Sequence, residues 1–331
     1  MRLVYAGTPA FAVASLEALL ALRPRHELVA VVTQPDRPRG RSRHEQPPPV
    51  KEAALVLGFP ADRILQPLSI NAPYVLGLLG SLEPDLICVS AYGGLFKSAA
   101  LALPKRYCLG AHASLLPGHR GASPIQAAIL EGDTDTGVSI LKMVAALDAG
   151  PLLLQRAIPI APDETSATLH DRLARLAGEC FVEAVRLIEQ GGETFTPQDA
   201  SKATYAPKLM KDSGHLDWSR GAEYLERFVR AMTPWPGAWC VISAPEGSRP
   251  LRLRVGATGK PRDRSLPREA DPGHGWLLAA KGAEPACLEV LCGDGRVLPI
   301  TAVQPEGRRE MSVQEFMAGA GQRYAYICRF E

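Results

Sequence analysis

The sequence has no apolar run of the about 20 residues that cross a bilayer, and its apolar start, Met1–Gly7, is too short for a secretory signal. Its seven cysteines are scattered without a CxxC pair, which argues against a zinc ribbon and a disulfide framework. The net charge is only +2 and 46% of the residues are hydrophobic, which excludes a disordered chain. These absences predict a cytoplasmic protein with reduced, mostly buried thiols.

Two nucleotide-binding motifs are also missing. The turn after the first expected strand reads Gly7-Thr8-Pro9 instead of GxGxxG, and GxxxxGK[ST] occurs nowhere in the chain. The dinucleotide-binding fingerprint and the P-loop are therefore absent. The turn leaves two interpretations open, a tight strand-to-helix connection or a helix N-terminus that holds an anion.

The first half of the chain alternates apolar strands with amphipathic helices. We expect strands at 3–6, 28–33, 85–90, 107–111 and 137–143, and helices at 11–22, 49–57, 123–130 and 165–190. Strands separated by helices form a mostly parallel sheet covered on both faces, so the expected fold class is α/β.

The pattern changes after residue 192. Residues 193–208 are polar with prolines and indicate a linker, and a helix is expected at 222–232. Short strands separated by turn residues follow at 239–243, 250–255, 275–280, 286–292 and 296–303, which predicts a small antiparallel barrel. The length of 331 residues suits this division into a first domain (1–192), a linker (193–208) and a second domain (209–331).

A cluster of arginines follows the second expected strand. The prolines and glycine of residues 34–44 prevent a helix, so the cluster lies on a loop beyond the end of a parallel strand, where α/β sheets bind ligands. A run of charges is usually a solvated surface, but here no acidic residue separates the arginines. We therefore expect phosphate contacts from Arg37, Arg39, Arg41 and Arg43.

One histidine and one aspartate follow strands of the same expected sheet. His112 ends the strand at 107–111, and Asp148 follows the strand at 137–143. A lone histidine is commonly structural, and an aspartate beside glycine commonly forms a turn. If the two strands are neighbours, however, their C-terminal loops converge, and Asp148 orients His112 and stabilises its charge.

The second half carries its own basic stretch. Residues 249–268 contain seven basic side chains and a single acid, Asp263. Arg252 and Arg254 are two residues apart, so in a strand they project from the same face. On a small barrel this pattern predicts a surface that follows a nucleic-acid backbone.

Taken in order, short motifs along nearly the whole chain make it similar to the methionyl-tRNA formyltransferases, which depend on 10-formyltetrahydrofolate. These motifs are AGTP (6–9), TQPDRPRGR (33–41), AYG (91–93), HASLLPGHRGASPIQ (112–126), GDTDTGVSILKM (132–143), LDAG (147–150), YAPKL (205–209), LDWS (216–219) and TPWPGAW (233–239).

The resemblance implies formyl transfer to the α-amino group of initiator methionyl-tRNA, for translation initiation, without a metal and by a monomer. It implies a Rossmann-like catalytic domain and an OB-type barrel. It places the acceptor end of the tRNA against Arg37–Arg43, with Arg41 weighted most, and catalysis on His112 and Asp148. It places the folate around Ala91, Tyr92, Gly93, Ser114, Leu115, Leu116 and Pro117.

The chain departs from the family pattern at one catalytic position. Where the family has Asn-x-His, this chain has Gly110-Ala111-His112, so the side-chain amide is missing. Milder departures are Ala149 in place of threonine and Gly118 in place of a basic residue. Two alternatives therefore stay open beside the active enzyme: a weakened or inactive homologue that binds folate or tRNA, and a formyltransferase for another amine, such as a nucleotide sugar.

Overall fold

The structure is a computed structural model of residues 1–331, and it describes all of them except 39–43, 244–249, 265–269, 279–285, 320–327 and 331. The chain divides into two compact units. Unit 1 comprises Met1–Pro124, Asp135–Pro159 and Leu169–Pro207, and unit 2 comprises Ile125–Thr134, Ile160–Thr168 and Lys208–Glu331. Most of the segment expected as a linker, residues 193–207, therefore belongs to unit 1.

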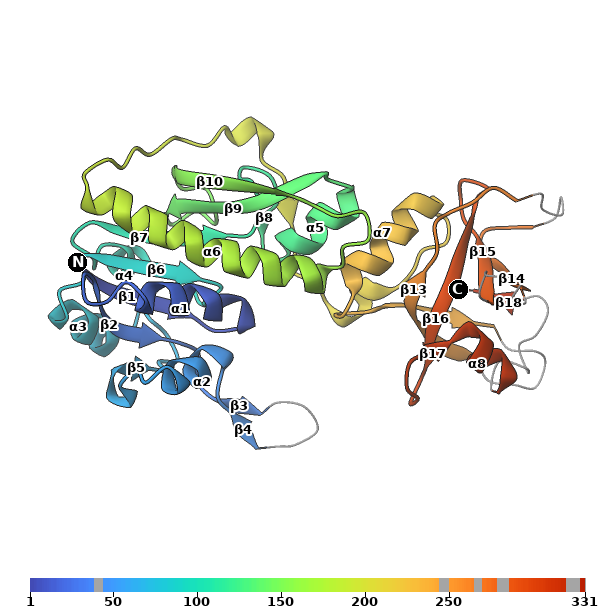
Figure 1. Ribbon diagram of the computed structural model, residues 1–331, viewed down its shortest axis with the longest axis horizontal. Helices are drawn as coiled ribbons and strands as arrows, with labels where there is room; N and C mark the ends of the chain where they lie inside the picture. The colour runs from blue at the N-terminus through green and yellow to red at the C-terminus, as the bar shows by residue number, and fades with distance from the viewer. Residues whose placement is uncertain (39–43, 244–249, 265–269, 279–285, 320–327, 331) are drawn as a thin grey trace. The chain divides into compact units, whose positions relative to one another are not determined.

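Unit 1 is built on a seven-stranded sheet with the order β10-β9-β7-β6-β1-β2-β5 (Figure 1). Its strands are β1 (Arg2–Gly7), β2 (Glu27–Val32), β5 (Ile64–Leu65), β6 (Leu86–Ser90), β7 (Tyr107–His112), β9 (Asp135–Lys142) and β10 (Leu152–Pro159). Four strand pairs are parallel, namely β5–β2, β2–β1, β1–β6 and β6–β7. The pairs β7–β9 and β9–β10 are antiparallel. The expected α/β class with a mostly parallel sheet is confirmed.

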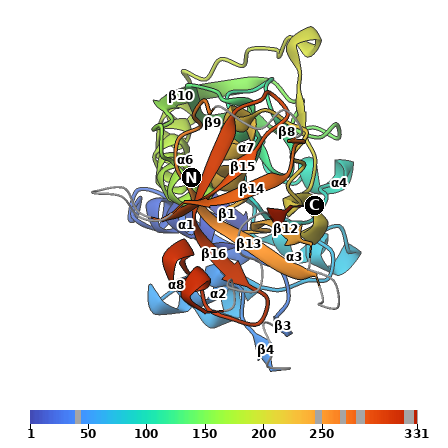
Figure 2. The same cartoon turned by 90° about the vertical axis from the view of Figure 1, so that its right-hand side faces the viewer.

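Helices cover both faces of this sheet, which is why β6 is buried at every position. In the two views of the ribbon, α1 and α6 lie on one face, and α3 and α4 lie on the other (Figures 1 and 2). The helix expected at 11–22 is shorter, because its first turn, Ala10–Ala12, is a 3₁₀ helix. The helices of this half are α1 (Val13–Leu20), α2 (Pro49–Val56), α3 (Pro73–Ser81), α4 (Ser98–Leu101) and α6 (Ser166–Glu189).

The direction of β9 differs from the expectation. The strands β7 and β9 are neighbours, as expected, but His112 pairs with Ser139 and Leu109 pairs with Lys142, so the strands are antiparallel. Their C-terminal ends therefore point to opposite edges of the sheet, and the idea that their C-terminal loops converge is wrong. Asp148 nevertheless reaches His112, because residues 143–150 return along the sheet before β10 begins.

Two short strand pairs extend unit 1. One is the antiparallel pair of β3 (Arg37–Pro38) and β4 (Glu45–Gln46). The other is the parallel pair of β8 (Arg120–Gly121) and β11 (Tyr205–Ala206). The second pair holds the end of the 193–207 segment beside the loop that follows His112.

Unit 2 contains a curled antiparallel sheet with the order β12-β13-β16-β15-β14-β18, and β17 pairs with β16. An isolated bridge between Ile242 and Phe330 links its two ends, and the sheet curls into an antiparallel half-barrel where a small antiparallel barrel was expected. The OB type of this barrel stays a prediction. Its elements are α5 (Pro124–Glu131), α7 (Ala222–Met232), β12 (Ala238–Ile242), β13 (Leu251–Thr258), β14 (His274–Leu278), β15 (Cys287–Leu291), β16 (Val297–Pro305), β17 (Met311–Ser312), α8 (Val313–Ala318) and β18 (Cys328–Arg329).

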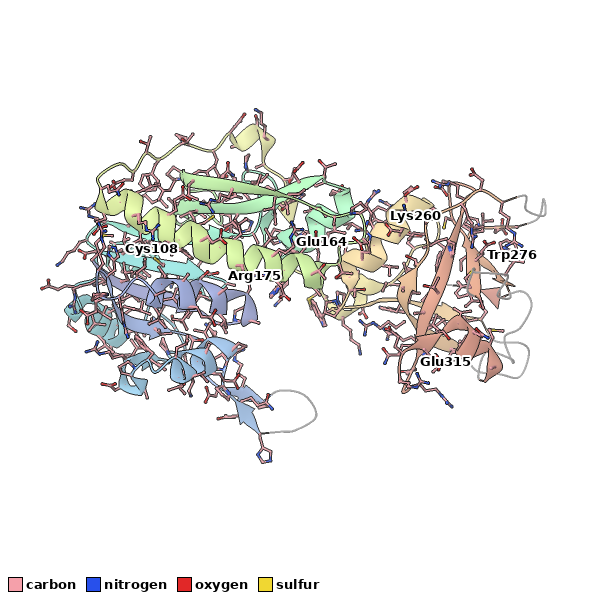
Figure 3. All side chains as sticks on the ribbon, in the orientation of Figure 1. Cys108, Glu164, Arg175, Lys260, Trp276 and Glu315 are labelled. Carbon is pink, nitrogen blue, oxygen red and sulfur yellow. The ribbon has the colours of Figure 1, made fainter. Side chains whose placement is uncertain are left out.

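Six of the seven cysteines are free and buried, as expected. Figure 3 shows one of them, Cys108, in the sheet of unit 1. Burial raises the pKa of the Cys88 thiol to about 12, and it raises the pKa of Cys108 further. Across the described part of the chain, no helix is long and apolar enough to span a bilayer, and no group of three or more His, Cys, Asp or Glu could hold a metal ion.

Candidate active site

Three loops meet at the edge of the sheet where β1, β2 and β6 end. The Thr8 hydroxyl donates a hydrogen bond to the Tyr92 carbonyl over 2.8 Å and accepts one from the Gln34 amide over 3.3 Å. In this way the Gly7-Thr8-Pro9 turn ties the loop after β2 to Ala91-Tyr92-Gly93. Ala91 and Gly93 have positive φ angles of 47° and 81°, so the backbone turns sharply on both sides of the buried Tyr92.

The imidazole of His112 is held in a defined orientation at the end of β7. Its Nε2 lies 2.8 Å from the His119 carbonyl oxygen, which can only accept, so Nε2 carries the hydrogen. Its Nδ1 lies 3.7 Å from Oδ2 of Asp148. Nδ1 is therefore the ring nitrogen that faces the Asp148 carboxylate.

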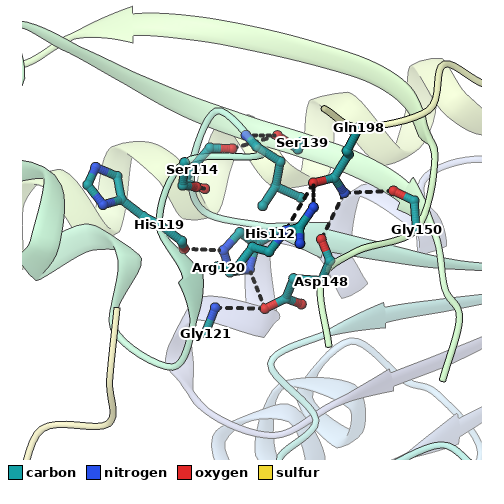
Figure 4. A network of polar contacts seen from close by, with 11 residues as sticks. His112, Ser114, His119, Arg120, Gly121, Ser139, Asp148, Gly150 and Gln198 are labelled. Atoms are coloured by element: carbon teal, nitrogen blue, oxygen red, sulfur yellow. Dashed lines mark hydrogen bonds and ion pairs between the residues drawn. The ribbon is translucent and has the colours of Figure 1, made fainter. Parts of the chain in front are cut away.

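Asp148 sits on the loop between β9 and β10 with a φ of 50°, a left-handed conformation that non-glycine residues adopt rarely. Its Oδ2 accepts a hydrogen bond from the Gly121 amide over 2.9 Å. The structure thus brings the predicted pair, His112 and Asp148, together at one edge of the sheet (Figure 4).

The turn at 114–118 is fixed by two side chains that the sequence reasoning missed. Ser139 donates to the Ser114 carbonyl over 2.6 Å and accepts from the Leu116 amide over 3.0 Å. Gln155 donates to the Leu116 carbonyl over 2.9 Å. The Ser114 hydroxyl donates to the Gly118 carbonyl and is fully buried, so it shapes the turn from within. Of the four predicted folate contacts on this turn, Leu115 and Pro117 are partly exposed.

Arg120 and Gln198 contact each other beside the loop that carries Asp148, and neither was predicted as a site residue. Arg120 is only 5% exposed, and its Nε and Nη2 donate to Oε1 of Gln198 over 3.2 and 2.7 Å. Gln198 in turn donates to the Asp148 and Gly150 carbonyls (Figure 4). The polar, proline-containing segment that carries Gln198 gave no hydrophobic pattern, and this is why it was interpreted as a linker.

Position 110, where the family has asparagine, is closed by apolar side chains. Gly110 lies between Val89 on β6 and Leu141 on β9. A Cβ atom placed on Gly110 would lie 3.3 Å from Cδ2 of Leu141 and 3.3 Å from Cγ of Met143. The space beside Gly110 is therefore occupied by hydrocarbon, two residues before His112 on the same strand.

The arginine loop is described only at its base. Arg37 lies on β3, whereas Arg39, Arg41 and Arg43 fall outside the described residues. The preceding Asp36 accepts hydrogen bonds from Lys51 over 2.8 Å and from Gln66 over 2.6 Å. Both contacts lower the pKa of the Asp36 carboxyl, and the hydrogen bond from Gln66 has the larger effect. The base of the loop is thus anchored by an ion pair that joins it to α2.

In unit 2, Arg252 and Arg254 share one face of the barrel, as predicted. The Arg252 guanidinium lies 3.7 Å from the ring centroid of Trp239, and Arg254 pairs across the sheet with Trp239 itself. Nη2 of Arg254 also donates to the Pro234 carbonyl over 2.7 Å. An arginine stacked on an indole forms a surface on which nucleic-acid bases and phosphates can bind.

Two other arginines of the basic stretch have a different role from the one expected. Arg262 and Arg264 both pair with the carboxylate of Glu289, which is 3% exposed, and the Arg262 contact measures 2.8 Å. The single carboxylate of Glu289 thus compensates one of the two positive charges, and both guanidinium groups stay partly exposed. Arg249 and Arg268 lie outside the described residues.

Comparisons with known proteins show which family the chain belongs to. Residues 1–185 match the family described as formyl transferase, and residues 208–321 match the formyl transferase C-terminal domain. The methionyl-tRNA formyltransferase of Marinobacter nauticus is 40% identical over 322 residues, covering 97% of both chains. That of Chromohalobacter salexigens is 43% identical over 328 residues, covering 98% of this chain and 95% of the relative.

Solved structures share the fold at low sequence identity. HypX from Aquifex aeolicus in complex with tetrahydrofolic acid is 19% identical, with a TM-score of 0.58 over 97% of this chain and 48% of that chain. The sugar 3N-formyl transferase WlaRD is 14% identical, with a TM-score of 0.62 over 93% of this chain and 99% of that chain. The agreement with the curated relatives over almost their full length shows that the chain belongs to the methionyl-tRNA formyltransferase family.

Proposed function

We propose that this chain transfers the formyl group of 10-formyltetrahydrofolate to the α-amino group of initiator methionyl-tRNA, and that it does so as a cytoplasmic monomer. The observation that carries the proposal is the pairing of His112 with Asp148. Nδ1 of the ring faces the carboxylate at 3.7 Å, while Nε2 is fixed on the His119 carbonyl. Family membership supports the same reaction, because the curated relatives carry this activity in their names.

The proposed chemistry is an exchange of one carbon–nitrogen bond for another. The substrate amine attacks the formyl carbon, and the resulting tetrahedral oxyanion collapses as the bond to N10 of the folate breaks. The amine loses one proton and N10 gains one, so a group that carries a proton between them lowers the barrier. His112 is suited to this role through Nδ1, and Asp148 stabilises the imidazolium while it holds the proton.

The folate is proposed to lie against the 114–118 turn and the 91–93 loop. Leu115 and Pro117 are the partly exposed side chains of the turn, and the buried Ser114 and Leu116 hold its shape. The tRNA is proposed to contact the arginine loop, whose base is anchored by Asp36 and Lys51, and the Arg252–Arg254 face of the barrel. A small amine substrate would require neither of these two basic surfaces. Their presence therefore favours a tRNA substrate over a nucleotide sugar.

A second candidate function is supported by the closure of position 110. Without an amide there, and with Leu141 and Met143 filling the space, one donor to the oxyanion is missing. Losing such a donor costs about 10²–10³ in rate. A protein that binds folate and tRNA with little turnover is the alternative that this observation favours.

The experiment that tests the proposed function is a formylation assay with methionyl-tRNA and 10-formyltetrahydrofolate. We expect measurable transfer by the wild type and its loss in His112→Ala, because no other described group takes the place of Nδ1 beside Asp148. Thermal unfolding of both proteins serves as the control for folding. Transfer by His112→Ala at the wild-type rate would refute the role of His112, and binding of both substrates without transfer by the wild type would favour the second candidate.

A further inference from the structure

Gln198 joins two parts of unit 1 that are distant in the sequence. Its Nε2 donates to the Asp148 carbonyl over 2.8 Å and to the Gly150 carbonyl over 2.7 Å. Its Oε1 accepts from both Nε and Nη2 of Arg120. Figure 4 shows the amide between the Asp148 loop and the Arg120 guanidinium. A single neutral side chain thus links the backbone that carries Asp148 to the residue that follows His119.

The orientation of this amide follows from its neighbours. Carbonyl oxygens only accept hydrogen bonds and a guanidinium only donates them, so a flipped amide would lose every one of these contacts. Arg120 is 5% exposed, and within the described part of the chain no carboxylate lies at ion-pair distance from it. Its charge therefore acts on Oε1 of Gln198, and a charged donor makes such hydrogen bonds stronger than neutral ones.

The Asp148 loop needs such a support because little else holds it. Asp148 has a φ of 50°, and Leu147 before it is 64% exposed, so this part of the loop lacks apolar packing. The side chain of Asp148 is tied by the Gly121 amide, and its backbone is tied by Gln198. Loss of the backbone tie leaves the carboxylate free to rotate away from Nδ1 of His112.

We propose that Gln198 is a positioning residue for formyl transfer, which holds the backbone of Asp148 so that its carboxylate faces His112. The inference rests on the proposed function of His112 and Asp148. Gln198 itself touches no reacting atom in this scheme, and its effect passes through the Asp148 loop. Misplacing a catalytic group by about 1 Å can cost 10²-fold in rate, so a support of this kind has a measurable effect.

The kinetic test uses Gln198→Met, which keeps the length of the side chain and removes both ends of the amide. We expect kcat to fall about 10- to 100-fold while KM for methionyl-tRNA and for the formyl donor stays unchanged. Gln190→Met is the matched control, because Gln190 is exposed at the end of α6 and its side chain takes no part in the site. A second variant, Gln198→Glu, can still pair with Arg120 but cannot donate to the carbonyls, so we expect it to be equally impaired.

A second measurement reports the position of Asp148 and does not depend on enzyme activity. The Gly121 amide donates to the Asp148 carboxylate, whereas the next amide, Ala122, donates to the Ala206 carbonyl over 2.9 Å beside the β8–β11 pair. Hydrogen exchange followed by NMR reports the two amides separately. In Gln198→Met we expect faster exchange at Gly121 and unchanged protection at Ala122.

The outcomes separate this inference from the proposed function. Loss of protection at both amides would mean that the whole 193–207 segment detaches, and protection at both would mean that Gln198 does not hold Asp148; either result overturns the proposal. Wild-type kcat in Gln198→Glu overturns it as well. If the wild type shows no transfer but Gly121 alone loses protection in Gln198→Met, the proposed function fails while the positioning of Asp148 stands.

Discussion

Restoring the missing amide is the sharpest test of how this site works. Gly110→Asn places a donor two residues before His112 on β7, at the position where the family has asparagine. An oxyanion donor contributes about 3–4 kcal/mol to the transition state, so the variant is expected to raise kcat by up to about 10²–10³-fold. The new side chain needs room, however, because its Cβ would lie 3.3 Å from both Leu141 and Met143.

The steric cost can be bounded from the same contacts. Overpacking a core costs about 1–3 kcal/mol, and the low end is expected here because Met143 is unbranched and only partly buried. A loss of 1 kcal/mol lowers Tm by about 2–4 °C in a domain of this size. Because native domains are stable by about 5–15 kcal/mol, a cost of this size leaves Gly110→Asn folded, and its rate can be measured on the folded protein.

The assay is a single-turnover measurement of formyl-methionyl-tRNA at saturating 10-formyltetrahydrofolate. Gly110→Ala is the matched control, since it adds the same Cβ without the amide and is expected to lower Tm without raising the rate. A Gly110→Asn protein that folds, binds both substrates and reacts no faster than the wild type would refute the reasoning that an amide at this position polarises the formyl oxygen.

Three further predictions concern other parts of the chain. Arg41→Ala should raise KM for methionyl-tRNA and leave KM for the formyl donor unchanged, and tRNA affinity should fall steeply with salt; equal loss for both substrates in steady-state kinetics would contradict the role of the loop. The pKa of Asp36 is lowered from its ordinary value of 3.8, so its contacts stabilise the fold above that pH and the stabilisation is lost as acid protonates the folded carboxyl. Asp36→Asn should therefore reduce the free energy of unfolding at pH 7 and leave it unchanged at pH 2, measured by urea denaturation, and an equal loss at both pH values would exclude the ion pair as its source. The six buried cysteines should react with a thiol reagent only after denaturation, because burial excludes the reagent and raises the pKa of thiols such as Cys88 to about 12; rapid labelling of Cys88 in the native protein would show that the sheet opens.

Local patterns predicted the elements well but not their directions. The helix Ala222–Met232 and the buried strand Leu86–Ser90 follow their hydrophobic periodicity closely, because the burial of each is decided by its own residues. The antiparallel direction of β9 is set by pairing with β7 and β10, and a run of apolar residues carries no information about the direction of its neighbour. The proximity of His112 and Asp148 was therefore predicted correctly, although the strand direction from which it was inferred is wrong.

The residues that support the site were missed for a related reason. Ser139, Gln155 and Gln198 act through hydrogen bonds to backbone carbonyls that are far away in the sequence. Such contacts leave no periodic signal, and a polar residue in a proline-containing stretch has the same appearance whether it is solvated or bound. Arg262 and Arg264 show the converse case, since their contacts with Glu289 depend on the pairing of β14, β15 and β16.

The return of residues 193–207 to the sheet has a consequence for the modularity of this chain. A fragment cut at residue 185, where the formyl transferase match ends, retains all seven strands of the sheet but loses Gln198, which holds the Asp148 backbone, and Thr204, whose hydroxyl accepts from the His119 amide. If recombination joined this domain to another C-terminal module at residue 185, the hybrid would contain the whole sheet. It would lack Gln198 and Thr204, which hold the active site in place. Unit 1 runs to Pro207, so a fragment that keeps these supports has to extend at least to that residue.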